Sequence, residues 1–524
     1  MIDRSVGARG MMSSLDDRQD GRARRLLHGW SANLVQMMLG LTQQLLLIPA
    51  FLHVWTGEML AAWLVIYAAG GLMAVADAGL QLRAINRFLA FKACVDCDGR
   101  TAQFYRAMLG IYFTMAAGLG ILLCIVIPLA PPSSLLGFSE IPAFDVALLV
   151  MTVGMLLTLP ANPVSGLYRV RGRYGRAVWQ QNVALVLGQV AQSAALFVSG
   201  SLLAVAIAFV STQIVLTVFV VAFDAPRLFP FLRRTGVMCA LPSLRWGIGQ
   251  LGRALPFAIA NMTELALVNL PVLLVSALVT NRLAVAQWGL TRVIASLVRS
   301  LCLQLTLPIA AELGHDHAVG DTERLRRLYG YGSVFVTGLA SLIVAGLLSF
   351  WADFFALWTH GSIPYDGPLA VTLLLGSAAV APALLALGLA NYSNRGDLLI
   401  RTKGLQLVTF LILSLLMIPS LGPLGAAIAL VASDILIQFG LLGLIIMRQT
   451  LRRPFRHLAF LALVMAAILA LGWLGGLAIA ALVPGTGLVR FLAECTIWLA
   501  LVGILASPLL VERLRKRLLG MIPD

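Results

Sequence analysis

The chain has 524 residues, of which 60% are hydrophobic and 12% charged, and its 38 lysines and arginines exceed its 23 aspartates and glutamates to give a net charge of +15. Because soluble domains carry roughly 25% charged residues, this composition excludes a water-soluble enzyme or binding module and indicates an integral membrane protein. It leaves no soluble segment large enough to hold a nucleic acid, so we expect no nucleic-acid partner despite the positive charge.

Fourteen apolar segments are long enough to cross a membrane, since about 20 helical residues span roughly 30 Å of hydrocarbon. In chain order they lie near residues 28 to 52, 59 to 82, 106 to 130, 143 to 163, 178 to 199, 202 to 223, 255 to 280, 283 to 311, 329 to 350, 368 to 390, 402 to 420, 422 to 446, 458 to 482 and 488 to 511. Backbone polar groups in lipid must be paired within their own segment, and the sequence lacks the alternating pattern of a membrane barrel. It therefore predicts an all-α, polytopic fold of about 14 transmembrane helices.

The distribution of lysine and arginine predicts the orientation. Positive residues gather in the joints that follow even-numbered spans, such as the joint with Arg83 and Arg87, and are nearly absent from the other joints, where Arg282 and Arg490 are exceptions. Residues 1 to 27 form a polar tail without the apolar core of a signal peptide. The positive-inside rule then places both termini in the cytoplasm, and anionic lipid is the simplest partner for the charged joints.

Motifs for catalysis or cofactor binding are missing from these joints. The longest outer joints, near 129 to 142 and 351 to 367, are too short to build a folded active site. The cytoplasmic joints contain no Ser-His-Asp or phosphate-loop pattern, and the pair Cys94 and Cys97 has only His315 and His317 as candidates for further zinc ligands. We therefore expect a transporter rather than an enzyme, with no metal and no cofactor.

The sequence contains an internal repeat. Trp63 in the second span and Trp288 in the eighth are 225 residues apart, and the charged segments that begin at Asp96 and Val319 have a similar offset, near 223. Both halves start in the cytoplasm, so the repeats are parallel. The sequence predicts two parallel six-helix lobes, residues 28–223 and 255–446, joined by a cytoplasmic linker at 224–254. Helices 13 and 14, at 447–511, and a basic tail at 512–524 complete the organisation.

Two segments carry a family resemblance. Val54 to Phe88, whose span ends in Asp77-Ala78-Gly79, resembles the early signature of polysaccharide transporters, the Wzx-type lipid-linked oligosaccharide flippases of the multidrug/oligosaccharidyl-lipid/polysaccharide (MOP) superfamily. Leu307 to Tyr329 is similar to the family's joint after helix eight, and with fourteen spans the resemblance covers nearly the whole chain. It implies a cavity between two six-helix lobes, alternating access, a polyprenyl-diphosphate glycan as cargo, the bacterial inner membrane, and partners among polysaccharide polymerase and export machinery.

Uncharged amides form stripes on two spans. They are Asn33, Gln36, Gln43 and Gln44 on one side of the first span, and Gln181, Gln189 and Gln192 on or beside one side of the fifth. Such amides either hydrogen-bond neighbouring helices or line a cavity that takes the hydroxyls of a sugar. Both interpretations remain open at this point, and the second makes these residues candidates for substrate binding.

Two arginines lie inside the eighth span. Arg292 and Arg299 share one face, with Ser296 between them, and at 1.5 Å per residue Arg292 lies roughly 13 Å from the outer start of the helix. Each arginine near the membrane midplane costs about 2.5 to 3.5 kcal/mol, so each needs a partner. Glu264, on the antiparallel seventh span, has a similar depth and is one candidate partner for Arg292. The other is the diphosphate of a cargo, which the planar donor fork of arginine binds well.

Buried carboxylates are candidates for ion coupling. Asp434 on the twelfth span is deep, with Gln438 one turn along, and Asp77 lies near the cytoplasmic end of the second span. Together with Glu264 they are candidate proton or sodium sites. For Asp77, hydrogen bonding at the helix end is an equally open interpretation.

Sequence and resemblance together predict a flippase that moves a polyprenyl-diphosphate-linked oligosaccharide, the repeat unit of a surface polysaccharide, to the outer leaflet of the inner membrane. Arg83 and Arg87 would attract the diphosphate at the inner mouth, and Arg292 and Arg299 would hold it. The alternative is an ion-coupled multidrug or metabolite antiporter of the same superfamily. A cavity for cationic drugs should be acidic, and the two arginines argue against one.

Overall fold

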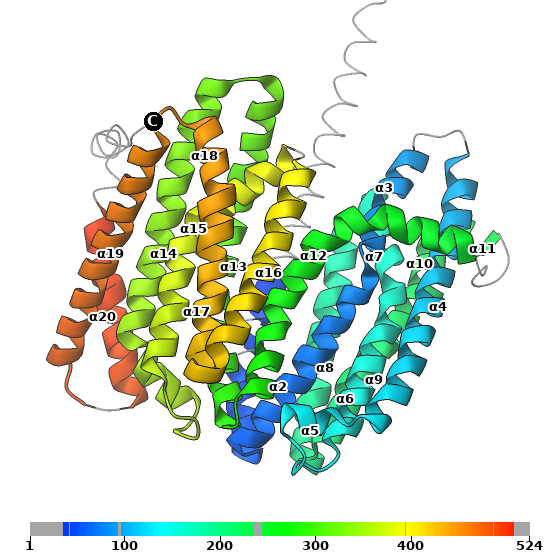
Figure 1. The fold of residues 1–524 in the computed structure, drawn as a ribbon, viewed down its shortest axis with the longest axis horizontal. Helices are drawn as coiled ribbons and strands as arrows, with labels where there is room; N and C mark the ends of the chain where they lie inside the picture. The colour runs from blue at the N-terminus through cyan, green and yellow to red at the C-terminus, as the bar shows by residue number, and fades with distance from the viewer. Residues whose placement is uncertain are drawn as a thin grey trace, which may run out of the picture. The chain divides into compact units, whose positions relative to one another are not determined.

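The computed structural model describes residues 35–40, 42–43, 45–92, 96–234, 244–393, 395–485 and 487–507. Over these residues the chain forms helices without strands (Figure 1), and 14 helical segments, from Val35–Val54 to Leu488–Ala506, are long and apolar enough to cross a membrane. This confirms the all-α, polytopic fold class and the predicted number of spans. Some helices extend beyond the predicted spans, because polar turns at their ends continue the hydrogen-bonded backbone of the apolar segment.

The first of two compact units contains Met1–Ala50, Met73–Pro131 and Ala143–Ala258. Its elements include η1 (Met73–Asp77), α3 (Leu80–Lys92), α4 (Cys97–Leu129), α6 (Phe144–Thr158), η2 (Leu159–Ala161), α7 (Asn162–Val170), α8 (Tyr174–Ser199), α9 (Leu202–Val218), η3 (Phe219–Asp224), α10 (Ala225–Leu228) and α11 (Phe231–Arg234). Large aromatic side chains at Phe88, Tyr112 and Tyr168 are fully buried in its core. Burial of such large rings contributes to the apolar core of this unit.

The second unit contains Phe51–Leu72, Pro132–Pro142 and Ile259–Asp524. Its elements are α2 (Gly57–Leu72), α5 (Pro132–Leu136), most of α12 (Leu244–Leu278), α13 (Leu283–Val319), α14 (Thr322–Trp358), α15 (Gly367–Tyr392), α16 (Gly396–Leu421), α17 (Pro423–Ser433), η4 (Asp434–Gly443), α18 (Leu444–Thr450), α19 (Pro454–Leu482) and α20 (Leu488–Ala506). Helix α13 packs along α15, and α14 lies beside α19 and α20 (Figure 1).

Two stretches of the predicted N-terminal lobe group with the second unit, namely Phe51–Leu72 and Pro132–Pro142. Helix α2 packs on α13, where the absence of a side chain at Gly289 allows a close approach, since a Cβ there would meet Leu64 Cδ1 at 2.8 Å. The second span is therefore divided between the two units, although its apolar sequence is continuous.

Arg282, an exception in the charge pattern of the joints, holds the stretch Pro132–Pro142. Its Nη1 donates to the carbonyl oxygen of Leu136 at 3.2 Å, and its guanidinium lies 5.5 Å from the centroid of the Phe138 ring. Ser276 Oγ donates to the same carbonyl at 2.8 Å. Arg282 thus stabilises a turn of the second unit by backbone hydrogen bonds and a cation–π contact.

Equivalent features recur in the two halves of the sequence. Asp96 and Asp321 are also 225 residues apart, and their side chains accept from the backbone N–H groups of Gly99 and Arg324 at 3.1 and 3.0 Å to cap α4 and α14. Trp63 and Trp288, at the same offset, are both buried. The sixth span of each half contains a π-helical segment, η3 in one and η4 in the other. These features support the internal repeat.

The second span is interrupted after Asp77. Ala78 and Gly79 have φ angles of +46° and +73°, which end the 3₁₀ segment before α3 begins. A Cβ at Gly79 would meet the carbonyl oxygen of Ala254 and the backbone nitrogen of Ala258 at 2.7 Å. Glycine is required there for its conformation and for the close approach of α12.

Candidate substrate site

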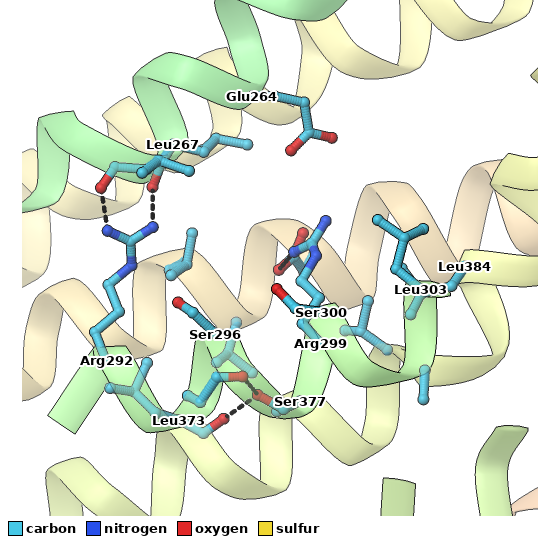
Figure 2. Close-up of a pocket in the computed structure, with 18 residues that line it drawn as sticks. Glu264, Leu267, Arg292, Ser296, Arg299, Ser300, Leu303, Leu373, Ser377 and Leu384 are labelled. Atoms are coloured by element: carbon cyan, nitrogen blue, oxygen red, sulfur yellow. Dashed lines mark hydrogen bonds and ion pairs between the residues drawn. The ribbon is translucent and has the colours of Figure 1, made fainter. Parts of the chain in front are cut away.

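A cavity of about 250 Å³ lies in the second unit between α12, α13, α15, α17 and η4. Its charged lining residues are Glu264 from α12, Arg292 and Arg299 from α13, and Asp434 from the start of η4. Figure 2 shows the side chains of Glu264, Arg292 and Arg299 directed into the same space between α12 and α13. The structure thus brings together four residues that the sequence predicted as functional from three different spans.

The geometry of α13 explains how its two arginines reach one cavity. Arg292 and Arg299 are seven residues apart, so they lie on one face of the helix with Ser296 between them. The opposite side is apolar and includes the buried Leu290 and Ile294. Helix α13 therefore buries one face in the unit and turns its arginines toward the cavity, as its sequence predicts.

Arg299 and Asp434 form a salt bridge of 3.1 Å between Nη1 and Oδ2. The side chain of Asp434 is only 9% exposed, and its Oδ1 accepts a second hydrogen bond, of 2.5 Å, from Gln406 Nε2 on α16. The Oε1 of Gln406 accepts in turn from Gln438 Nε2 at 2.7 Å. Both oxygens of this buried carboxylate are thus paired, as a buried charge requires.

Glu264 forms a salt bridge with Lys403 of α16, a residue that the sequence analysis did not single out. The side chain of Lys403 is 3% exposed, whereas that of Glu264 is 43% exposed toward the cavity. Lys403 lies one residue inside the predicted start of the eleventh span, where a lysine ordinarily extends to the lipid headgroups. Its spacing of three residues from Gln406, which puts the two side chains on one face of α16, was the signal available in the sequence.

Arg292 makes no salt bridge with Glu264, so the pairing considered from the sequence is wrong for this structure. Its Nη2 donates to the carbonyl oxygen of Leu267 at 3.1 Å, and its Nη1 donates to that of Val268, as the dashed lines in Figure 2 show. The physical reason is that the carboxylate of Glu264 is paired with Lys403 instead. The carbonyl of Leu267 is available to Arg292 because the residue four positions later is Pro271, which has no N–H to donate to it.

The charges around this cavity do not balance. Among the residues that the structure describes here, Arg292, Arg299 and Lys403 contribute three positive charges, and Glu264 and Asp434 contribute two negative ones. Each carboxylate is matched with one cation, while Arg292 is matched only with backbone carbonyls. The site therefore has a surplus of one positive charge, which favours an anion.

Asp77 belongs to a separate cluster in the first unit. Its Oδ1 accepts from the hydroxyl of Tyr112 and from Asn162 Nδ2, the latter at 2.9 Å, and its Oδ2 accepts from the backbone N–H of Gln81 at 3.3 Å. These contacts tie the break in the second span to α4 and α7. They fit the hydrogen-bonding interpretation of Asp77.

Arg83 and Arg87 lie on α3 of the first unit. Arg83 Nε donates to Gln250 Oε1 at 3.4 Å. Arg87 lines another pocket, of about 360 Å³, together with Arg100, and its guanidinium lies 5.8 Å from the centroid of the Phe91 ring. This basic and aromatic surface is compatible with a phosphate group.

The structure describes some of the residues of the two amide stripes. Asn33 and Gln44 lie outside the described residues. Gln36 Nε2 donates to Gln181 Oε1 at 3.4 Å, so the predicted stripes of the first and fifth spans meet. Gln192 is 1% exposed, and Gln189 is partly buried, whereas Gln36 and Gln43 are partly accessible. Burial favours a packing role for Gln192 and keeps Gln36 and Gln43 as candidates for substrate contact.

Comparison with known proteins identifies the fold. No family model and no curated protein matches the sequence. The structure is similar to that of the lipid II flippase MurJ in an inward closed conformation, with a TM-score of 0.70 and 11% identity over 92% of this chain and 99% of that one. It is also similar to an inward-facing multidrug resistance MATE family transporter of the MOP superfamily, with a TM-score of 0.58 and 15% identity over 83% of this chain and 98% of that one.

A third similar structure is a mutant MATE transporter from Vibrio cholerae, with a TM-score of 0.53 and 17% identity over 83% of this chain and 99% of that one. The chain therefore has the fold of MOP superfamily transporters, along nearly their whole length. None of the three is a polysaccharide transporter by its name, and at these identities the likeness concerns the fold alone.

Proposed function

We propose that this chain is a flippase that moves a polyprenyl-diphosphate-linked oligosaccharide from the cytoplasmic to the outer leaflet of a bacterial inner membrane by alternating access. The observation that carries the proposal is the cavity of the second unit, which is lined by two arginines and two carboxylates, with the buried Lys403 paired to one of these carboxylates. A diphosphate is an anion with several acceptor oxygens, and arginine binds such groups with two parallel hydrogen bonds. The fold that the chain shares with a lipid II flippase supports the same class of cargo.

One of the two arginines that line the cavity is paired with a carboxylate. Arg299 is paired with Asp434, and its side chain is still 33% exposed, so its donors can be reached from the cavity. An entering diphosphate would compete with Asp434 for Arg299 and would add its attraction to the surplus charge of Arg292. In the absence of cargo, the salt bridge with Asp434 keeps Arg299 paired, which avoids the cost of an isolated charge inside the protein.

The size of the cavity limits what it can hold. Pockets for drug-sized ligands measure roughly 300–1,000 Å³, and this one measures about 250 Å³. It suits a diphosphate with little of the attached sugar. Gln36 and Gln43 of the first unit remain candidates for the sugar hydroxyls, because neither is buried. The polyprenyl tail, being apolar, would stay in the bilayer.

The alternative function is an ion-coupled multidrug or metabolite antiporter. The structural similarity to MATE transporters favours it, as do the two carboxylates of the cavity. However, Glu264 and Asp434 are each neutralised by a cation of the chain itself. A cationic drug would have to displace Lys403 or Arg299 and would then meet their repulsion.

Binding by purified protein tests the proposal. The double variant R299Q/D434N removes one positive and one negative charge, so the net charge of the cavity is unchanged while the donor fork is lost. Hydrogen bonds to charged groups contribute about 1.5–3 kcal/mol, and each 1.4 kcal/mol is tenfold in affinity. We expect this variant to bind a fluorescent polyprenyl-diphosphate oligosaccharide with an affinity at least about tenfold lower than that of the wild type. The affinity is measured by titration in detergent.

The matched control is R490Q/E494Q. Arg490 and Glu494 on α20 also form an ion pair, of 2.7 Å, but neither lines the cavity. This variant should bind the cargo as the wild type does. Equal binding by the wild type and R299Q/D434N, with both proteins folded, would exclude the cavity as the diphosphate site. Tight binding of a cationic dye, with none of the glycan lipid, would favour the antiporter.

A further inference from the structure

Lys403 is the most deeply buried cation of the cavity region, and its position is unusual. Its side chain is 3% exposed, and its Nζ donates to Glu264 Oε1 and, at 3.4 Å, to Gln406 Oε1. An ammonium buried at this depth requires oxygen acceptors around it. The ammonium of lysine is a compact point charge without the planar donor fork of arginine. The oxygen acceptors that surround it could therefore also surround a small inorganic cation.

The acceptors come from separate helices. Glu264 belongs to α12 and Gln406 to α16, and Gln406 is fixed by donating to Asp434 of η4 and accepting from Gln438. This chain of amides aims Gln406 Oε1 toward Nζ. Carboxylate and amide oxygens are the ligands that hard cations prefer.

We infer that Lys403 fills a monovalent-cation site whose oxygens come from Glu264 and Gln406, so that the ammonium of the chain stands where sodium would otherwise bind. This inference deepens the proposed function, because it implies that transport needs no sodium gradient. Only this implication rests on the proposed function. The sequence pointed to Glu264 and Asp434 as candidate sodium or proton sites. The structure shows that both are already matched by cations of the chain.

The charges also specify the valence of the cation. Arg299 neutralises Asp434, which leaves the single negative charge of Glu264 opposite Lys403. Removal of the lysine charge would therefore leave a site with one net negative charge. Such a site is balanced by a monovalent cation and would be overcompensated by a divalent one.

The test compares thermal unfolding of purified protein in sodium chloride and in choline chloride at equal ionic strength. Choline is too large to replace an ammonium group between these oxygens. The wild type should have the same melting temperature in both salts. The variant K403M keeps most of the side-chain volume without the charge. It should melt lower than the wild type in choline and show a saturable rise of its melting temperature with sodium, because a ligand that binds only the folded state stabilises it.

The control is K403M/E264Q, which removes both members of the ion pair. It should fold in either salt and should not respond to sodium. A sodium-specific shift in the wild type would overturn the inference whatever the variants do. So would a K403M protein that is indifferent to sodium, or one that cannot be recovered in either salt while K403M/E264Q can. Recovery of K403M only in sodium would support it. The assay needs no transport, so failure of the proposed function would leave this result intact.

Discussion

Arg292 donates to the carbonyl oxygen of Leu267 at 3.1 Å, the oxygen that Pro271 leaves without a partner in α12. In an α-helix the carbonyl of residue i accepts from the N–H of residue i+4, and proline has none. In a membrane an unpaired carbonyl is costly, since water is absent. Arg292 on α13 thus donates the hydrogen bond that is missing from the backbone of α12. This hydrogen bond joins two of the helices that line the cavity.

The first prediction separates this backbone role from a charge role. R292A should destabilise the protein by about 1–3 kcal/mol, the cost of leaving a buried polar group unsatisfied. P271A restores a backbone N–H opposite Leu267, so in that background R292A should cost much less. The measurement is a double-mutant cycle of thermal unfolding. Strictly additive effects would mean that Arg292 and the gap at Pro271 are independent.

The second prediction concerns the buried carboxylate of Asp434. R299Q removes its salt bridge but leaves the hydrogen bond from Gln406. We expect R299Q to lower the free energy of unfolding by about 1–3 kcal/mol, less than the 3–5 kcal/mol for complete isolation of a buried charge. D434N in the same chain should restore most of the loss, because the charge that required a partner is gone. Equal stability of R299Q and the wild type would mean that the salt bridge contributes nothing.

The third prediction uses two glycines with the same backbone angle. Gly79 and Gly172 both have φ of +73°, but a Cβ at Gly79 would meet backbone atoms of α12 at 2.7 Å, whereas nothing lies within 4 Å of one at Gly172. G172A should cost about 1 kcal/mol, from strain alone. G79A should cost a further 1–3 kcal/mol or so, from overpacking. Thermal unfolding of the two variants measures the difference, and similar losses would contradict the close approach.

The fourth prediction concerns orientation. In a background without the six native cysteines, single cysteines at Ser134 and Gly361 should react with a membrane-impermeant thiol reagent in intact cells. A cysteine at Gly172 should react only after the cells are opened. All three positions are exposed in the structure, so access to the reagent depends on the side of the membrane. Labelling of the Gly172 position from outside would reverse the orientation and, with it, the proposed direction of transport.

The sequence predicted the elements of the fold well because each apolar span must pair its own backbone. It could also place Arg292 and Glu264 at similar depths and Asp434 deep in its span, since depth follows from position in a span. It could not identify partners, because depth does not determine which helix faces meet. Lys403 near the start of its span therefore gave little signal, and Glu264 was considered for Arg292. The carbonyl that accepts from Arg292 could be anticipated at Pro271, but not the side chain that reaches it.

The break of the second span shows the same limit. Asp77-Ala78-Gly79 was recognised as a motif, but a run of apolar residues continues into it, and hydropathy does not record a φ angle. The positive φ of Gly79 and the packing of α12 against it together explain why glycine is needed there. The partners of the charged cavity residues and the need for glycine after Asp77 thus both depend on contacts between segments distant in the sequence.

Translocation in proteoliposomes tests the central claim most directly. A fluorescent polyprenyl-diphosphate oligosaccharide would be incorporated into both leaflets, and a membrane-impermeant glycosidase added outside would report the fraction that reaches the outer leaflet. We predict that wild-type protein and R490Q/E494Q expose nearly all of the glycan, whereas R299Q/D434N exposes little more than protein-free vesicles. A wild-type protein that leaves the inner glycan protected, while it transports a cationic dye across the same vesicles, would contradict the account.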